Sequence, residues 1–413
     1  MQQMTSEHAT LEPAAGAPPT RVELFVPAND DPTLDPEVSI VVPALNEQIT
    51  IGEFVDWCKE GLQKAGVRGE ILIVDSSSDQ TPHIALQHGA RVLRTPKGGL
   101  GRAYIDAIPF IRGSLIIMGD CDLTYDFREI GEFVARYREG YEFIMGSRFL
   151  GSIEPDAMPK LHRYFGTPLT TWIMNSIYHT RFTDIHCGMR GLTKSALQRI
   201  DLHSQSWEYA SEMVLKASRL RLRIAEVPVS FFKDREGRLS HLKRGGILAP
   251  WSAGWINLKV MLVYTPDSFL LKPGLALFVL AALLTTSLAH GGYFLGPVGL
   301  DLHWMLLGMT LAVLGYGSFQ IGMIARLHHQ LRIGVAMAFA KAYSYDRGMI
   351  AAALLTGVGI LFDLRLLAEY VGNGYRLLDI SYYGVFGLFL IIMGFQTFTF
   401  TLSIEMMKRF SRV

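Results

Sequence analysis

Residues 115–126 read Leu-Ile-Ile-Met-Gly-Asp-Cys-Asp-Leu-Thr-Tyr-Asp. The four apolar residues predict a buried strand, and the glycine and acids after them predict that it ends at a sheet edge. Asp120 and Asp122 stand one residue apart, so both carboxylates can face one hard cation shared with substrate phosphates. The alternative is that these acids cap a following helix. Spacing alone leaves both interpretations open.

Short apolar runs alternate with longer amphipathic segments before this turn. Residues 38–42, 70–74 and 91–93 are typical of strands, and residues 51–65 and 81–88 are typical of helices. This alternation predicts a parallel sheet with right-handed crossovers. We therefore expect an α/β fold with a mostly parallel sheet, whose ligands bind beyond the carboxyl ends of the strands.

Polar or glycine-rich segments follow each of these three strands, at residues 43–47, 75–82 and 97–103. Each segment alone also fits a helix cap or a flexible loop. All of them would lie on the same rim as Asp120 and Asp122, and this convergence favours a ligand site.

Composition narrows the classes of protein. The 413 residues include 39 Lys and Arg against 38 Asp and Glu, a balance that argues against a nucleic-acid partner. The three cysteines are far apart, which predicts reduced thiols without a disulfide framework. Residues 1–37 are rich in Ala, Pro and Thr and lack the pattern of a signal peptide, so we expect a flexible tail with a short strand near residues 22–26.

Apolar residues concentrate after residue 270. Four stretches approach the roughly 20 residues that cross a bilayer, namely 273–300, 302–325, 348–362 and 381–404. Lys and Arg are frequent between the second and third stretches and in the C-terminal tail. This bias predicts an integral membrane protein with both termini and its catalytic domain in the cytoplasm.

Two segments connect the predicted sheet domain to the membrane. Residues 233–244 are rich in Lys and Arg, which fits a solvated loop, a lipid-facing strip or an anion clamp. Residues 245–268 mix Trp, Lys and Tyr with apolar bulk, which predicts amphipathic helices in the membrane interface. The expected domains are thus a tail (1–37), a catalytic domain (38–244), interfacial helices (245–268) and a membrane domain of about four helices (269–413).

Five motifs occur in a fixed order along the predicted catalytic domain. They are Pro43-Ala44-Leu45-Asn46-Glu47, residues 75–81, Asp120-Cys121-Asp122, Gly146-Ser147-Arg148 and Asp184-Ile185-His186-Cys187-Gly188-Met189-Arg190. The set resembles inverting glycosyltransferases of family 2. With residues 235–242 it most resembles the polyprenyl-phosphate glycosyltransferases, such as dolichol-phosphate mannose or glucose synthases, over residues 38–245. The resemblance implies a GT-A-like fold.

The resemblance also implies ligands and site residues. A UDP- or GDP-sugar would bind at Pro43, Asn46, Glu47, Asp75, Asp79, Gly99, Asp120 and Asp122. Mg²⁺ or Mn²⁺ would bind at Asp120 and Asp122, and this chain has Thr124 where relatives often carry Gln. The phosphate of a polyprenyl (undecaprenyl or dolichyl) acceptor would contact Arg148, Arg235, Arg238 and Ser240. The implied catalytic residues are Asp122, Arg148 and Arg235.

The expected reaction joins two anions. A lipid phosphate is already ionised near pH 7, so it needs cationic side chains more than a general base. Attack from the face opposite the leaving diphosphate would invert the sugar, and the product would be a lipid-linked monosaccharide for glycan or glycoprotein assembly. Two roles stay open: Arg190 either serves the site or pairs with Asp184, and Glu212 either contacts a sugar hydroxyl or caps a turn.

Two other functions compete with this hypothesis. A processive membrane polysaccharide synthase of the same superfamily typically carries Gln-x-x-Arg-Trp, a pentapeptide that does not occur in the sequence. A non-catalytic membrane scaffold is the second alternative, and the acidic pair and Arg235 argue against it. Whether the chain forms a homo-oligomer is left open.

Overall fold

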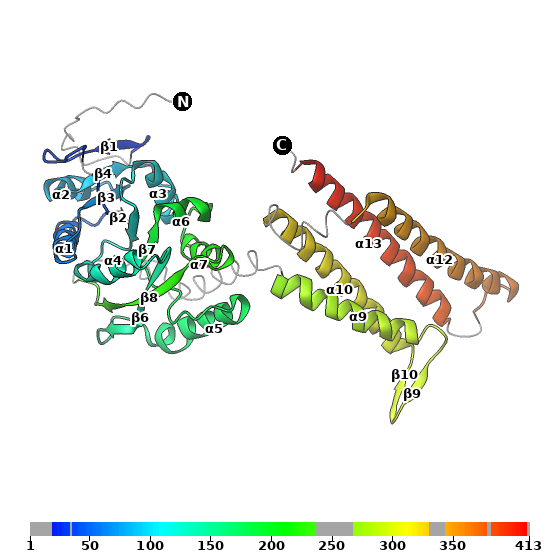
Figure 1. The fold of residues 1–413 in the computed structure, drawn as a ribbon. Coiled ribbons are helices and arrows are strands. Elements are labelled where there is room, and N and C mark those ends of the chain that lie inside the picture. The colour runs from blue at the N-terminus through cyan, green and yellow to red at the C-terminus, as the bar shows by residue number, and fades with distance from the viewer. Residues whose placement is uncertain (1–18, 34, 236–266, 330–342, 378–380, 411–413) are drawn as a thin grey trace. The chain divides into compact units, whose positions relative to one another are not determined.

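The computed structural model describes residues 19–33, 35–235, 267–329, 343–377 and 381–410. The chain divides into two compact units, Met1–Met261 and Leu262–Val413, which are described separately (Figure 1).

An eight-stranded sheet forms the centre of the first unit, in the order β1-β4-β3-β2-β5-β7-β6-β8. Its strands are β1 (Glu23–Phe25), β2 (Val38–Ala44), β3 (Gly69–Asp75), β4 (Arg91–Arg94), β5 (Leu115–Met118), β6 (Phe143–Ile153), β7 (Arg190–Thr193) and β8 (Ile224–Phe231). Strands β4, β3, β2 and β5 are parallel, β6 and β8 are parallel to each other, and β1 and β7 are antiparallel to their neighbours. The predicted mostly parallel α/β sheet is confirmed.

Helices cover both faces of this sheet. They are α1 (Ile51–Lys64), α2 (Thr81–Gln87), α3 (Leu100–Ala107), α4 (Gly131–Arg138), α5 (Thr167–Tyr178), α6 (Lys194–Ile200) and α7 (Tyr209–Arg219). Helices α1, α2 and α4 lie on one side, and α3, α6 and α7 on the other (Figure 1). Helix α1 has one buried apolar face, as expected for a helix that packs on a sheet. This face consists of residues that recur at helical spacing, namely Ile51, Phe54, Val55, Cys58 and Leu62.

The second unit contains two helix pairs. Helix α9 (Lys272–Ser287) packs on α10 (Leu302–His329), and α12 (Tyr345–Gly372) packs on α13 (Tyr382–Phe410). Four stretches are long and apolar enough to cross a membrane, namely Ser268–Ser287, Leu302–Arg326, Tyr345–Gly372 and Tyr382–Lys408. Glycines such as Gly359 and Gly394 let backbones approach closely, as is common between membrane helices.

Two predicted membrane segments have different bounds from those expected. The first helix ends at Ser287 rather than near residue 300, because the chain turns into a hairpin of β9 (Tyr293–Leu295) and β10 (Val298–Leu300). Gly291 and Gly296 adopt the positive φ angles that this hairpin requires. The third helix is longer than expected, because it continues beyond residue 362 to Gly372. Nearly all of the expected interfacial segment 245–268 lies outside the described residues.

Candidate active site

The acidic turn follows β5 at the carboxyl edge of the parallel strands. Thr124 donates to Oδ1 of Asp122 twice, from its backbone nitrogen at 3.0 Å and from its hydroxyl at 2.5 Å. Leu123 between them is buried and has φ of 64°, a strained conformation for a leucine that is typical of functional sites. The turn therefore holds the Asp122 carboxylate in a defined orientation.

Capping of a following helix was the alternative role for Asp120 and Asp122, and a different acid makes this cap. Asp126, rather than Asp120 or Asp122, accepts from the backbone nitrogen of Arg128 and caps the short 3₁₀ helix Phe127–Glu129. The nearest helical segment after the turn thus has its own capping residue.

Asp120 lies against the loop that precedes β7. A Cβ added to Gly188 would stand 2.6 Å from Oδ2 of Asp120 and 3.0 Å from Cε2 of Tyr125. The Gly188 nitrogen donates to the Tyr125 hydroxyl at 2.8 Å, which fixes this loop beside the carboxylate. Gly188 is thus a site residue that the motif contains and that sequence reasoning did not single out.

The two carboxylates suit a hard cation that is completed by substrate. Among the described residues, no group of three or more His, Cys, Asp or Glu side chains is placed to hold a metal ion. Mg²⁺ commonly binds proteins through one or two carboxylates and takes its other ligands from water and substrate phosphates. Asp120 and Asp122 supply such a donor set.

The loops after β2 and β3 are tied together by side chains. Asn46, with φ of 59°, accepts from the Ser78 nitrogen at 3.0 Å and donates its own backbone nitrogen to the Ser77 hydroxyl at 2.7 Å. Asp79 accepts from the backbone nitrogens of Thr81 at 3.0 Å and Gln48 at 3.4 Å. The loops that carry most of the predicted nucleotide-binding residues thus form one connected rim.

Asp75 is the most strongly perturbed acid on this rim. It is fully buried, and its Oδ2 accepts from the Ser77 nitrogen and lies 3.2 Å from Nε of Arg94. Burial is the main reason that its pKa is raised to about 6. Its Oδ1 is buried without a hydrogen-bond partner among the described residues, and it can therefore accept a donor from a ligand.

Gly99 has a packing role. It has φ of 102° directly before α3, and a Cβ there would stand 2.4 Å from the carbonyl oxygen of Gln205. The nitrogen of Arg102 donates to the same carbonyl at 2.9 Å. The glycine lets α3 begin against the loop before α7.

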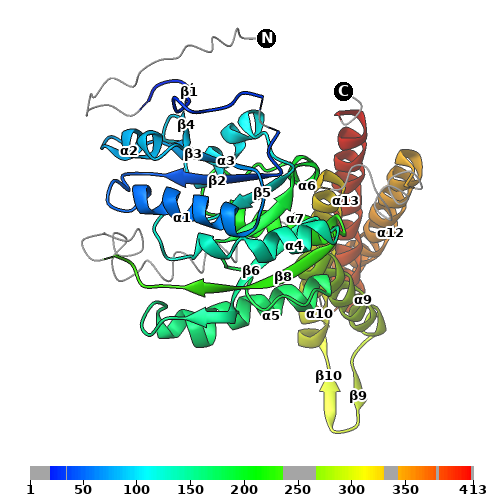
Figure 2. The same cartoon turned by 60° about the vertical axis from the view of Figure 1, so that its left-hand side comes forward.

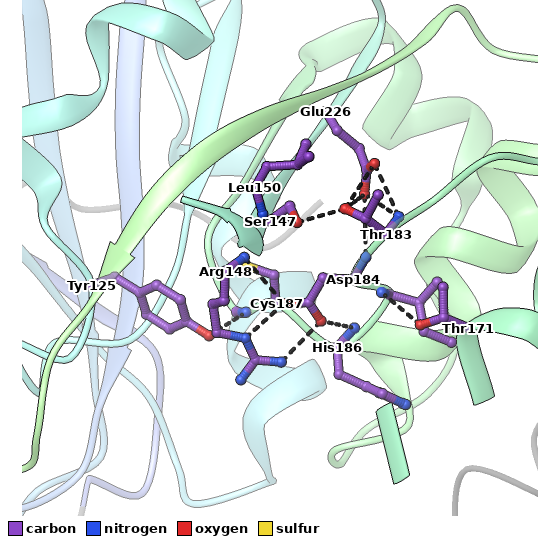
Figure 3. A network of polar contacts seen from close by, with 12 residues as sticks. Tyr125, Ser147, Arg148, Leu150, Thr171, Thr183, Asp184, His186, Cys187 and Glu226 are labelled. Carbon is purple, nitrogen blue, oxygen red and sulfur yellow. Dashed lines mark hydrogen bonds and ion pairs between the residues drawn. The ribbon is translucent and has the colours of Figure 1, made fainter. Parts of the chain in front are cut away.

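Arg148 and Asp184 form a buried ion pair (Figure 3). Nε and Nη2 of Arg148 donate to the two carboxylate oxygens at 2.7 and 2.9 Å. The alternative that Arg190 pairs with Asp184 is wrong, because Arg190 donates to the carbonyls of Cys187 and Ala210. The Glu226 carboxylate accepts from the backbone nitrogens of residues 183 and 184 and thereby holds the backbone of Asp184 in place.

Two titratable groups in this loop stay neutral near pH 7. Burial lowers the pKa of His186 to about 4, and its Nε2 lies 2.8 Å from the Thr170 hydroxyl. Burial raises the pKa of the Cys187 thiol to about 12. Neither side chain therefore adds charge near the acidic turn.

Arg235 lies at the end of the segment that leaves β8. The nitrogen of Phe232 donates to the carbonyl of Thr124 at 2.8 Å, which brings this segment beside the acidic turn. Nη2 of Arg235 then contacts Oε1 of Glu53 in the first turn of α1 at 2.5 Å, with both side chains about half-exposed. The predicted residues Arg238 and Ser240 lie outside the described residues.

Glu212 acts as a cap. Its buried carboxylate accepts from the backbone nitrogens of His203 and Ser204 at 3.1 and 2.8 Å, and Lys216 lies 2.6 Å away. Of the two roles left open for Glu212, the contacts match the structural one.

Comparison with known proteins identifies the family. Residues 39–201 match the model described as glycosyl transferase family 2, and residues 332–408 match its C-terminal transmembrane region. Over 294 residues the chain is 36% identical to the low-salt glycan biosynthesis hexosyltransferase Agl6 of Haloferax volcanii, covering 71% of this chain and 68% of that protein. The chain belongs to glycosyltransferase family 2, as the motifs predicted. It is a membrane-integral glycosyltransferase with a GT-A-like catalytic fold.

Two further similarities are more distant. A dolichyl-phosphate hexose transferase of Haloferax volcanii is 28% identical over 207 residues, covering 49% of this chain and 85% of that protein. Among solved structures, mannosyl-3-phosphoglycerate synthase from Rubrobacter xylanophilus is 18% identical with a TM-score of 0.46, covering 56% of this chain and 75% of that one.

Proposed function

We propose that this enzyme transfers a hexose from a UDP- or GDP-sugar to a polyprenyl phosphate, with inversion, at the cytoplasmic face of the membrane. One observation carries the proposal: the hydrogen bond from Phe232 to Thr124 joins the start of the basic segment to the acidic turn. Asp122 and Arg235 are thereby delivered to the same edge of the sheet. A cation-binding role for Asp122 and a phosphate-binding role for Arg235 at one edge would suit a reaction between two anionic substrates.

The donor would bind across the rim formed by the loops after β2, β3 and β5. The buried Oδ1 of Asp75, which has no partner among the described residues, would accept an N–H group of the nucleotide base. Pro43, Asn46 and Glu47 would line the base and ribose, and Asp79 would keep their loop in place through Gln48. Asp120 and Asp122 would face the diphosphate.

Asp120 and Asp122 would hold Mg²⁺ or Mn²⁺, which when bound would neutralise charge on the departing diphosphate. Thr124 would keep Asp122 oriented through its two hydrogen bonds. This arrangement would stabilise the leaving group without a protein acid, since a metal-bound nucleoside diphosphate needs no proton to depart.

The acceptor would be held by guanidinium groups on the other side of the sugar. Arg235 would exchange the exposed Glu53 carboxylate for the lipid phosphate, because an ion pair between half-exposed groups is weak. Arg238 and Ser240 would continue this contact. Arg148 donates two of its nitrogens to Asp184, so any contact with the phosphate would come from Nη1.

The relatives support the substrate classes. One of them is named as a dolichyl-phosphate hexose transferase and another as a glycan biosynthesis hexosyltransferase. The distribution of Lys and Arg supports a cytoplasmic catalytic domain spanning about residues 38–244, with both termini on that side.

A product assay tests the proposal. The full chain in vesicles is incubated with a panel of UDP- and GDP-hexoses, Mn²⁺ or Mg²⁺, and a polyprenyl phosphate, and lipid extracts are examined by mass spectrometry. We expect a polyprenyl-phosphate hexose from at least one donor. The matched control replaces the lipid phosphate by the corresponding prenol. A polysaccharide product, or transfer to the prenol alone, would contradict the proposal.

A further inference from the structure

Helix α5 has its polar and apolar faces reversed relative to the usual pattern. Thr167, Thr171 and Met174 recur at helical spacing and are buried. Leu169 and Trp172 of α5, with Phe165 of the π-helical turn that precedes it (His162–Gly166), would be expected to form a buried apolar stripe in a soluble domain. They point outward instead.

The inward orientation of the threonines is held by hydrogen bonds. The Thr170 hydroxyl lies 2.8 Å from Nε2 of His186, and the Thr171 hydroxyl accepts from the nitrogen of Ile185. Both partners belong to the loop that carries Asp184. The helix is therefore fixed to the catalytic loop through its polar side, which leaves its apolar side outside.

The outward side forms a large apolar surface. It consists of the exposed side chains Leu161 (59%), Tyr164 (72%), Phe165 (61%), Leu169 (40%) and Trp172 (66%). A groove of about 260 Å³ between α5 and β6 brings Phe149 next to Trp172 and extends this surface onto the sheet. We call these six residues the α5 surface. Clusters of exposed large apolar side chains are typical of interaction sites.

The basic residues near the α5 surface favour an anionic partner. Residues 157–183 contain Lys160, Arg163 and Arg181 and no Asp or Glu. Arg163 lies over the ring of Tyr164, with 5.6 Å between its Cζ and the ring centroid. Trp, Tyr, Phe and Leu on one side with basic residues beside them are the composition of helices that lie in the interface of an anionic bilayer.

We propose that the α5 surface docks the catalytic domain onto the lipid bilayer, with its apolar side chains entering the headgroup region. The chain itself carries four segments able to cross a membrane, so this domain belongs to a chain that is anchored in a bilayer. The α5 surface lies within the sheet domain, and its docking is independent of the interfacial role predicted for residues 245–268. A helix docked in this way would also contact the loop of Asp184, because Thr170 and Thr171 on its other side bind that loop.

Depth-dependent fluorescence tests the docking. Single cysteines replace Leu169 and, in a second variant, Phe165, and each is labelled with an environment-sensitive fluorophore in the full chain. The native cysteines are buried, so the introduced thiol is the reactive one. Vesicles contain phosphatidylcholine and phosphatidylglycerol, with or without nitroxide on the acyl chains. The matched control is Gln87→Cys, an exposed position on α2 at the other end of the domain (Figure 1, Figure 2).

We expect lipid nitroxides to quench the label at position 169 or 165 at least about threefold more than the label at position 87, because an interfacial helix inserts about 5–10 Å into the bilayer. Equal, weak quenching at all three positions would overturn the proposal. Blue-shifted emission that lipid nitroxides do not quench would also overturn it, because it would show that a second copy or another part of the protein covers this surface. Sugar transfer does not enter this readout, so its result is separable from the proposed function.

Discussion

Gly188→Ala is expected to displace Asp120 without unfolding the domain. The new Cβ would lie 2.6 Å from Oδ2 of Asp120, well inside van der Waals contact. The loop cannot easily retreat, because the Gly188 nitrogen is bound to the Tyr125 hydroxyl, so the carboxylate has to move. Misplacing a reacting group by about 1 Å can cost roughly a hundredfold in rate, or about 2.7 kcal/mol. When the movement of a side chain relieves overpacking, the free energy of unfolding falls by an amount near the low end of about 1–3 kcal/mol.

The assay compares kcat/KM for glycolipid formation and the thermal melting of the purified chain. Gly131→Ala is the matched control, because a Cβ at Gly131 meets nothing within 4 Å. We expect Gly188→Ala to lose roughly ten- to a hundredfold in kcat/KM while Gly131→Ala keeps the parent value. Parental activity in a folded Gly188→Ala variant would show that the position of Asp120 does not matter and would refute the reasoning.

Three other predictions concern charged groups. The pKa of Asp75 is about 6 in the folded chain and ordinarily 3.8. The stability that its protonated carboxyl contributes is therefore complete below about pH 4 and is lost as the pH rises through 6. Melting temperatures measured from about pH 4 to 7 should show this fall, and Asp75→Asn should not show it. Asp184→Asn should lower the free energy of unfolding by about 3–5 kcal/mol, because it leaves Arg148 buried without a charged partner; an unchanged denaturation midpoint would contradict this. Arg235→Ala should raise the KM for lipid phosphate roughly tenfold or more and change the KM for donor little; the reverse pattern in initial-rate kinetics would contradict the acceptor role.

The sheet was predictable because its signal is local. Alternating apolar runs and amphipathic segments gave β2 to β5 and their crossovers, and these strands are the elements that place the acidic turn. The limits of the first membrane helix were not predicted, because residues 288–300 are apolar enough to continue it. Their glycines, rather than their hydropathy, decide that they form a hairpin.

The site was less predictable, because its contacts join residues far apart in the sequence. A pairing of Asp184 with Arg190, six residues away, was one of two roles left open for Arg190, whereas the partner of Asp184 is Arg148 on β6. Likewise, the reversed faces of α5 appear only once Thr170 and Thr171 are seen to contact the neighbouring loop. Side-chain types and spacing indicated which residues gather at the edge of the sheet, but not which of them pair.

The most direct test is the transfer rate of Asp122→Ala, measured with nucleotide-sugar, Mn²⁺ and polyprenyl phosphate at saturating concentrations. Asp35→Ala, at an exposed position of the same unit, serves as the matched control. We predict that Asp122→Ala loses roughly a hundredfold to a thousandfold in turnover with an unchanged melting temperature, while the control keeps the parental rate. Near-parental turnover by Asp122→Ala would contradict a reaction that depends on the acidic turn.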